Sequence, residues 1–119
     1  MRRSQRLRHR RDVAAVQREG RAVHGDLLSL RVRPTGLPQS RFAFAVSRRV
    51  GKAVVRNRVK RRLRAAVAEL HPPGGFDVIV TARAPAAAAT YHELKAALAQ
   101  LLRRARVLER RPYGPAPGS

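Results

Sequence analysis

Residues 53–70 constrain the fold more than any other stretch of this chain. In "AVVRNRVKRRLRAAVAEL", five apolar residues recur at spacings of three or four and fall on one side of a helix: Val55, Val59, Leu63, Ala66 and Leu70. The breaker "PPGG" follows at once, and proline cannot continue a helix. The pattern predicts a long amphipathic helix that ends near Leu70 and needs other elements to cover its apolar stripe.

The rest of this helix is basic. Residues 53–67 carry six Lys or Arg and no acid, and we place Arg56, Lys60, Arg64, Asn57 and Arg61 on the far side. A solvated face is one explanation, because Arg and Lys are good helix formers. Like charges four residues apart destabilise a helix by a few tenths of a kcal/mol each, however, and a polyanionic partner would remove that cost. The uncompensated ladder favours the second explanation.

Asn57 has two interpretations. It could cap the helix, with Arg58 as the first helical residue. That choice crowds cations at the positive end of the helix dipole and separates Val55 from the stripe. In the other interpretation Asn57 lies within the helix, where its amide can bond a ribose or base while the neighbouring arginines bind phosphates.

Two shorter helices are expected on either side. Val13 and Val16 at helical spacing predict a helix over 12–20, where Gly20 would supply a left-handed C-cap. A capping box of Thr90 and Glu93 begins an amphipathic helix that runs to about residue 106. Strands are predicted over 27–32, 42–47 and 76–82, and loops over 34–40 and 83–89.

The order helix, strand, strand, helix, strand, helix leaves room for a fourth strand. It predicts an α+β domain in which a small sheet packs against helices. This single domain is expected over residues 12–108. A flexible basic arm over 1–11 would precede it, and a Pro/Gly-rich disordered tail over 109–119 would follow.

Charge points to nucleic acid. Lys and Arg number 27 against 7 Asp and Glu, a net charge of +20, and most of the cations are arginines, which match phosphate geometry. A GC-rich genome would also favour arginine, but it does not explain why no acid occurs between Asp26 and Glu69. The chain has no cysteine and no run of 18 apolar residues, so we expect no disulfide, no membrane span and a cytoplasmic location.

No catalytic constellation is apparent. The four histidines share no motif spacing, and the carboxylates form no cluster that would bind a metal. Asp77 could face RNA through a metal ion, but a surface carboxylate at a strand edge is the favoured interpretation. Phe42 and Phe44 could stack on bases, although a core role is favoured. We therefore expect no catalytic residue and no metal site on the protein.

The segment "FAFAVSRRVGKAVVRNRVKRRLRAAV" resembles the protein subunit of bacterial ribonuclease P. The likeness rests on a strand ending in "SRRVG" and on "RNR" followed by a hydrophobic residue and "KR". "RLRHRRDVAAVQREGR" is similar to the first helix of that family, and "FDVIVTARAPAAAATYHELKAALAQLL" to its last strand and closing helix. The resemblance extends over roughly residues 6–108.

The resemblance implies an α/β sandwich with a left-handed βαβ crossover around the RNR helix. It implies a large catalytic RNA as partner and precursor tRNA as substrate, with no obligate protein partner. The 5′ leader would be removed by chemistry on the RNA, with Mg²⁺ bound mainly by that RNA. The RNA-facing positions would be Arg48, Arg49, Lys52, Arg56, Asn57, Arg58, Lys60, Arg61 and Arg64. Arg62 lies nearer the apolar stripe, so its role is open.

The family also binds the leader in a cleft between the sheet and the first helix. Here the candidates are Val13, Gln17 and Arg31. Many members have aromatic residues near the first two positions and this chain has none, so leader contacts would rest more on arginine and backbone. A non-catalytic basic protein, such as a ribosomal protein, remains the alternative.

Overall fold

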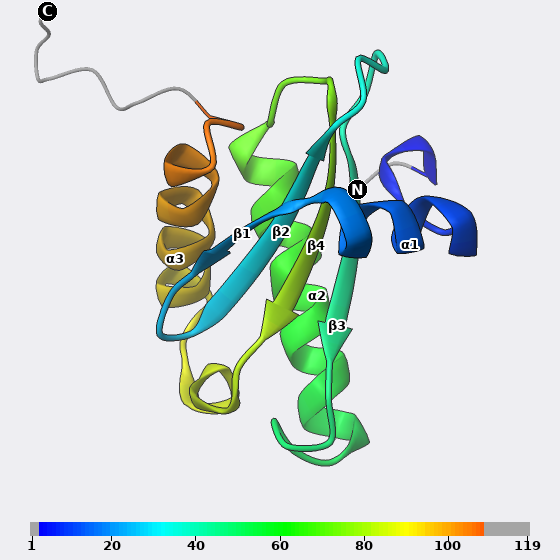
Figure 1. Ribbon diagram of the computed structural model, residues 1–119. Coiled ribbons are helices and arrows are strands. Elements are labelled where there is room, and N and C mark those ends of the chain that lie inside the picture. The colour runs from blue at the N-terminus through cyan, green and yellow to red at the C-terminus, as the bar shows by residue number, and fades with distance from the viewer. Residues whose placement is uncertain (1–2, 109–119) are drawn as a thin grey trace, which may run out of the picture.

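The computed structural model describes residues 3–108 as one four-stranded sheet with helices on both faces (Figure 1). In chain order the elements are η1 (Arg3–Gln5, a 3-10 helix), α1 (Arg10–Glu19), β1 (Arg21–His24), β2 (Leu28–Pro34), β3 (Arg41–Val46), α2 (Ala53–Leu70), β4 (Phe76–Ala82), η2 (Ala84–Ala88, a second 3-10 helix) and α3 (Tyr91–Arg104). The α+β class is confirmed, and β1 is the fourth strand that the sequence left open.

The sheet has the order β1-β2-β4-β3. Its first three strands pair antiparallel, with Leu30 opposite Val80, whereas β3 pairs parallel to β4, with Phe42 opposite Val78. The parallel pair is joined by α2. In Figure 1 both strands run downwards, β3 lies to the right of β4, and α2 passes behind them. This crossover is left-handed, against the usual right-handed rule.

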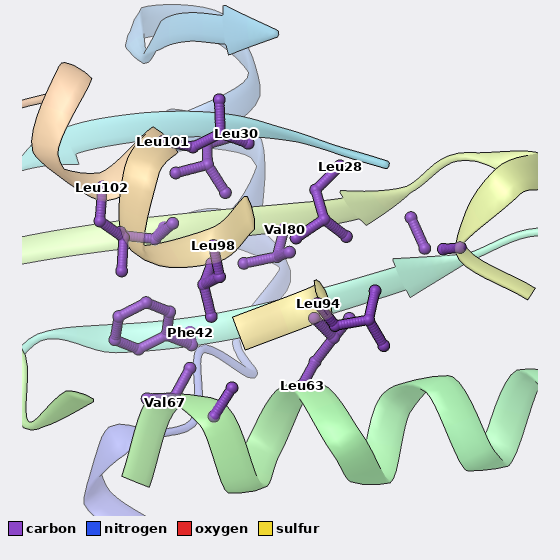
Figure 2. Close-up of a cluster of buried hydrophobic side chains, with 14 of the residues drawn as sticks. Leu28, Leu30, Phe42, Leu63, Val67, Val80, Leu94, Leu98, Leu101 and Leu102 are labelled. Carbon is purple, nitrogen blue, oxygen red and sulfur yellow. The ribbon is translucent and has the colours of Figure 1, made fainter. Parts of the chain in front are cut away.

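The main core lies between the sheet and the helices α2 and α3 (Figure 2). The predicted stripe of α2 is confirmed: Val59, Leu63 and Ala66 are fully buried, while Val55 and Leu70 pack at the margin. They meet alternate residues of the strands and one face of α3, including Leu28, Leu30, Phe42, Val80, Leu94, Leu98 and Leu102. Phe42 and Phe44 both belong to this core, as favoured.

A much smaller apolar cluster covers the opposite face of the sheet. Leu7, Val16 of α1 and Ile79 of β4 are buried there, with Val13 and Ala43 packed at the edge. Since α1 is the only α-helix on this face of the described chain (Figure 1), part of the face stays uncovered.

Most predicted boundaries agree with the structure. The long helix ends at Leu70, the strand over 76–82 is exact to the residue, and both bonds of the Thr90–Glu93 capping box are present. The left-handed cap at Gly20 is wrong, because its φ is −72°. Glycine is needed there for another reason: a Cβ would lie 2.4 Å from the carbonyl oxygen of Val16. The loop expected over 83–89 contains η2.

The expected flexible arm over 1–11 is wrong for its described part. Residues 10 and 11 belong to α1, and Leu7 is only 5% exposed. The N–H of Leu7 donates to the carbonyl of Phe42 at 2.9 Å, so the segment pairs with the edge strand β3. The residues over 109–119, expected to form a disordered tail, lie outside those the structure describes.

Candidate RNA interface

The first basic surface lies where β3 ends and α2 begins. Residues 47–52 connect the two elements, and the side chains of Arg48, Arg49 and Lys52 are all exposed. Lys52 is the N-cap residue of α2 and makes no side-chain cap bond. Because α2 begins at Ala53, Asn57 lies inside the helix, and the interpretation of Asn57 as a cap is wrong. Three cations therefore surround the positive end of the α2 dipole, where an anion is favoured.

One stripe of α2 faces solvent along the helix. Asn57, Arg61 and Arg64, at spacings of four and three, are exposed. Val54 continues the stripe at the first turn, and 77% of its surface is exposed. Exposure of an apolar side chain to water is not favourable, so this position is notable. This surface carries no acid, so it offers cationic and amide donors beside one apolar contact. We call residues 47–52 together with this stripe the α2 surface.

Arg56 and Lys60 lie closer to the core than the sequence suggested. Both are half-buried, and the Nε of Arg56 is buried without a hydrogen bond to any described residue. At 100° per residue these two positions flank the apolar stripe on one side of the helix. The placement of Arg56 on the far side is therefore wrong, and the exposed part of the ladder is shorter than predicted.

Arg58 and Arg62 flank the other side of α2 and contact η2 and the residue after it. Arg58 donates to the carbonyl of Ala87 at 3.3 Å, and Arg62 donates to that of Ala89 at 2.9 Å. The role of Arg62, which the sequence left undecided, is therefore structural. It donates to the carbonyl oxygen of Ala89, which lies outside the regular strands and helices. Arg58, predicted to face RNA, is half-buried and shares this role.

A groove lies on the uncovered face of the sheet beside α1. It encloses about 190 Å³, and its lining is mostly polar: Gln17, Ala22, His24, Ser29, Leu30, Arg31, Ile79 and Thr81. Two predicted cleft residues are brought together here, Gln17 from α1 and Arg31 from β2. Arg31 is held in place, since it donates to the carbonyl of Gly20 at 3.1 Å. Val13 is not part of the lining and packs in the small cluster instead.

Ser29 and Thr81 form part of the floor of this groove and were not among the predicted cleft residues. The signal was available, because both residues alternate with buried ones along β2 and β4. Residues at such positions must face away from the main core, and only α1 covers that side.

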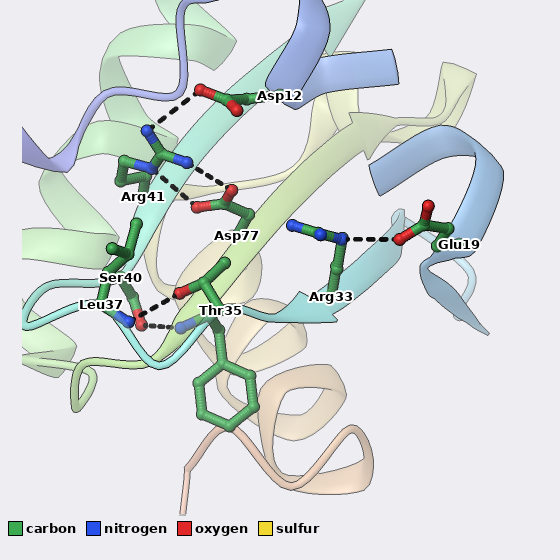
Figure 3. A network of polar contacts seen from close by, with 9 residues as sticks. Asp12, Glu19, Arg33, Thr35, Leu37, Ser40, Arg41 and Asp77 are labelled. Atoms are coloured by element: carbon green, nitrogen blue, oxygen red, sulfur yellow. Dashed lines mark hydrogen bonds and ion pairs between the residues drawn. The ribbon is translucent and has the colours of Figure 1, made fainter. Parts of the chain in front are cut away.

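Ion pairs fasten α1 to the sheet at both ends (Figure 3). Arg41 of β3 binds Asp77 with two bonds of 2.8 and 2.6 Å, and reaches Asp12 of α1 at 3.2 Å. At the other end of the helix, Arg33 of β2 binds Glu19 at 3.0 Å. The hydrogen bond to Asp77 raises the pKa of Arg41, and the hydrogen bond from Arg33 lowers the pKa of Glu19.

Asp77 is 0% exposed, so both interpretations from the sequence are wrong: it is neither a surface carboxylate nor a candidate to reach RNA through a metal. A buried carboxylate requires a charged partner, and Arg41 supplies it. Nothing in the local sequence indicated this pair, because its members are 36 residues apart.

Within residues 3–108 no three His, Asp or Glu side chains are grouped as metal ligands. None of the helices in this part of the chain is long and apolar enough to cross a membrane.

Comparisons with known proteins agree with this geometry. The sequence model of the Ribonuclease P family matches residues 1–106. The "Ribonuclease P protein component" of Roseiflexus castenholzii is 40% identical over 112 residues, which cover 92% of each chain. That of Chloroflexus aurantiacus is 41% identical over 111 residues, covering 91% of this chain and 82% of the relative.

Solved structures show the same fold. The RNase P protein of Staphylococcus aureus matches with a TM-score of 0.78 and 26% identity, covering 87% of this chain and 96% of that one. The RNase P protein of Thermotoga maritima matches with a TM-score of 0.76 and 30% identity, covering 83% and 96%. The fold and sites therefore define a basic α+β protein of the ribonuclease P type. This chain belongs to the Ribonuclease P family of bacterial protein components. The ribosomal alternative gains no support from these matches.

Proposed function

We propose that this protein binds the catalytic RNA of ribonuclease P through the α2 surface and assists the removal of 5′ leaders from precursor tRNA. The single observation that carries this proposal is the α2 surface itself: exposed Arg48, Arg49, Lys52, Arg61 and Arg64 with no carboxylate among them. Such a surface is stabilised by phosphates, which release counterions when they bind. The matching relatives named Ribonuclease P protein component support the choice of RNA.

Asn57 gives the α2 surface more than charge. Its amide lies one helical turn from Arg61 and can both donate and accept, as a 2′-hydroxyl or base edge requires. Arg58 and Arg56 contribute their charge from half-buried positions, so their removal would also disturb the protein.

The groove beside α1 is the proposed binding site for the leader. Its lining offers hydroxyl, amide and imidazole groups and the fixed guanidinium of Arg31, all of which can bond the phosphates and sugars of a single strand. The groove lining contains no Phe, Tyr or Trp, so the stacking of about 1–3 kcal/mol per base that those side chains provide is missing here, and His24 supplies its one aromatic ring. Leader binding in this protein therefore rests on polar contacts.

The chemistry is assigned to the RNA. Mg²⁺ requires several oxygen ligands, and the described carboxylates do not provide them, because Asp12 and Asp77 already share Arg41. These residues do not fit a magnesium site on the protein. The protein instead screens the repulsion between RNA segments, a role suited to a net charge of +20. A cytoplasmic location and the lack of an obligate protein partner remain predictions.

Reconstitution tests this proposal. Purified protein, its cognate ribonuclease P RNA and precursor tRNA would be combined in pairs and together, across a range of Mg²⁺ concentrations. We expect no cleavage by the protein alone, and cleavage at low Mg²⁺ only when protein and RNA are both present. Robust Mg²⁺-dependent cleavage by RNA-free protein would contradict the assignment of the chemistry to the RNA.

A further inference from the structure

Residues 3–11, which lead into the first turn of α1, present a second, separate set of cations. Five arginines lie within nine residues and all are exposed: Arg3, Arg6, Arg8, Arg10 and Arg11. Three of these arginines border an open hollow of about 630 Å³, which is lined by Arg3, Ser4, Arg6, Arg8, His9 and Arg41. We call residues 3–11 the anchored arm.

The backbone of the anchored arm is held on the protein. Leu7 is buried in the small cluster, its N–H bonds to β3, and the N–H of Arg6 bonds to the carbonyl of Arg3 at 3.1 Å. Residues on either side of a buried anchor point outwards, so Arg6 and Arg8 are presented to solvent. Fixing these arginines in advance lowers the entropy that is lost when they bind a partner.

No carboxylate among the described residues pairs with the arginines of this arm. Among the described residues, none of its five arginines forms an ion pair, and Asp12, the nearest acid in sequence, binds Arg41. Other parts of the same surface do pair their cations, as Arg18 and Arg33 do with Glu19. The missing counter-charge is therefore a property of this region and not of the whole chain.

The start of α1 adds to the imbalance. His9 is its N-cap residue and makes no side-chain cap bond, while Arg10 and Arg11 occupy the first turn. The one acid of that turn, Asp12, is paired with Arg41. Cations at the positive end of a helix dipole are unfavourable by about 0.3–1 kcal/mol each. An external anion beside these residues would interact favourably with both the helix dipole and the two arginines, and so would offset this cost.

The anchored arm is distinct from the α2 surface. It joins β3 at Phe42, near the start of the strand, whereas the loop over 47–52 follows the end of the strand at Val46. Four residues of strand separate these points by about 13 Å. Figure 1 shows the arm beside α1, at the β3 edge of the sheet. Its Gln5 lines a hollow with Val67 and Ala68 near the C-terminal end of α2, whereas the α2 surface lies around the N-terminal half of that helix.

We propose that the anchored arm is a second RNA-backbone site, which binds phosphates of a segment other than the one on the α2 surface. This inference rests on the proposed function only for the identity of the RNA. Those phosphates could belong to the ribonuclease P RNA or to the tRNA precursor, and the two sources are separated by experiment.

The first experiment replaces Arg6, Arg8 and Arg10 together by Gln. Binding of the full-length protein to the ribonuclease P RNA is measured between 50 and 200 mM salt, and binding of precursor and mature tRNA to the assembled holoenzyme is measured separately. Loss of three phosphate contacts lowers the slope of log affinity against log salt concentration by about 2–3. The ratio of wild-type affinity to variant affinity should therefore fall about 20- to 40-fold between 50 and 200 mM salt. An effect in the first assay assigns the site to the ribonuclease P RNA, and an effect only in the second assigns it to the precursor.

A matched control removes the same charge elsewhere. Arg18, Arg103 and Arg106 are replaced by Gln, which leaves the arm intact. The proposal would be overturned if the arm variant had an unchanged slope in both assays, or if its slopes equalled those of the control variant in both. Circular dichroism of each variant confirms that it is folded.

The second experiment maps the RNA directly. The chain has no cysteine, so His9→Cys and Ala53→Cys each offer one attachment point for an iron–EDTA cleavage reagent. Both side chains are exposed, one on the anchored arm and one at the start of α2. The proposal predicts cleavage of two different RNA segments. Cleavage from Ala53→Cys alone would contradict the arm site and leave the α2 surface intact, whereas cleavage from neither would contradict the proposed function itself.

Discussion

The two faces of the sheet are covered by opposite means. On one face, α2 and α3 bury a continuous core of leucine, valine and phenylalanine. On the other, α1 buries only Leu7, Val16 and Ile79, and is fastened by Arg41 and Arg33. Burial of apolar side chains on the first face provides most of the stability. On the second face, ion pairs hold α1 in place, and polar residues of the strands beside it stay uncovered. The groove lined by Gln17, Arg31 and Thr81 lies on this second face.

Truncation in the main core has the largest expected effect. Leu98→Ala removes a fully buried side chain of α3 that packs between the sheet and α2. It should lower the free energy of unfolding by about 3–5 kcal/mol, since the close-packed core cannot collapse into the cavity. Urea denaturation measures this change. A loss below 1 kcal/mol would show that this face is less tightly packed than described.

Arg41→Met should have the next largest effect. It leaves Asp77 buried without a partner and removes the link to Asp12, at an expected cost of about 3 kcal/mol. Asp77→Asn added to this variant should recover part of the loss, because a neutral amide is less costly to bury than a charge. If the double variant were less stable than Arg41→Met, the buried charge would not be the source of the cost.

Val16→Ala tests the small cluster. Val16 is fully buried between α1 and the sheet, and its two methyl groups contribute about 1–2 kcal/mol. We expect native-state hydrogen exchange in α1 to rise more than exchange in α3. Equal changes in both helices would mean that the two faces unfold as one unit.

Thr81→Glu should have the smallest effect on stability and act on binding instead. Thr81 is exposed in the groove, so a carboxylate there would repel the leader by about 1 kcal/mol, or about fivefold in affinity. Precursor tRNA should lose affinity for the holoenzyme while mature tRNA does not. Ala96→Glu, exposed on α3, adds the same charge away from the groove as a control. Equal losses for both tRNAs would contradict the proposed leader site.

The periodic elements could be predicted because their signals are local. Apolar spacing located α2, and hydrogen-bonding side chains located the start of α3. The helix stripe also indicated which residues of α2 face the core. The same spacing of 100° per residue puts Arg56 next to the stripe, so its inner position could have been predicted. Only the structure could show that Arg58 bonds to η2, because that contact depends on residues distant in sequence.

The second face was harder to predict for the same physical reason. Leu7 is the one buried residue of the anchored arm, and one isolated apolar side chain has no period to detect. The pair of Arg41 and Asp77 joins two strands across a crossover, so no spacing in the sequence signals it. The groove residues Gln17 and Arg31 were predicted from the resemblance to the family, and the structure shows which residues surround them.

Salt-dependent binding tests the central claim most directly. Arg48, Arg61 and Arg64 are exposed on the α2 surface and make no ion pair with any described residue, so their replacement by Gln should leave the protein folded. If α2 clamps the RNA, the log–log slope of binding to the ribonuclease P RNA against salt should shrink by about two units. An unchanged slope in this folded variant would mean that α2 is merely a solvated face and that the RNA binds elsewhere.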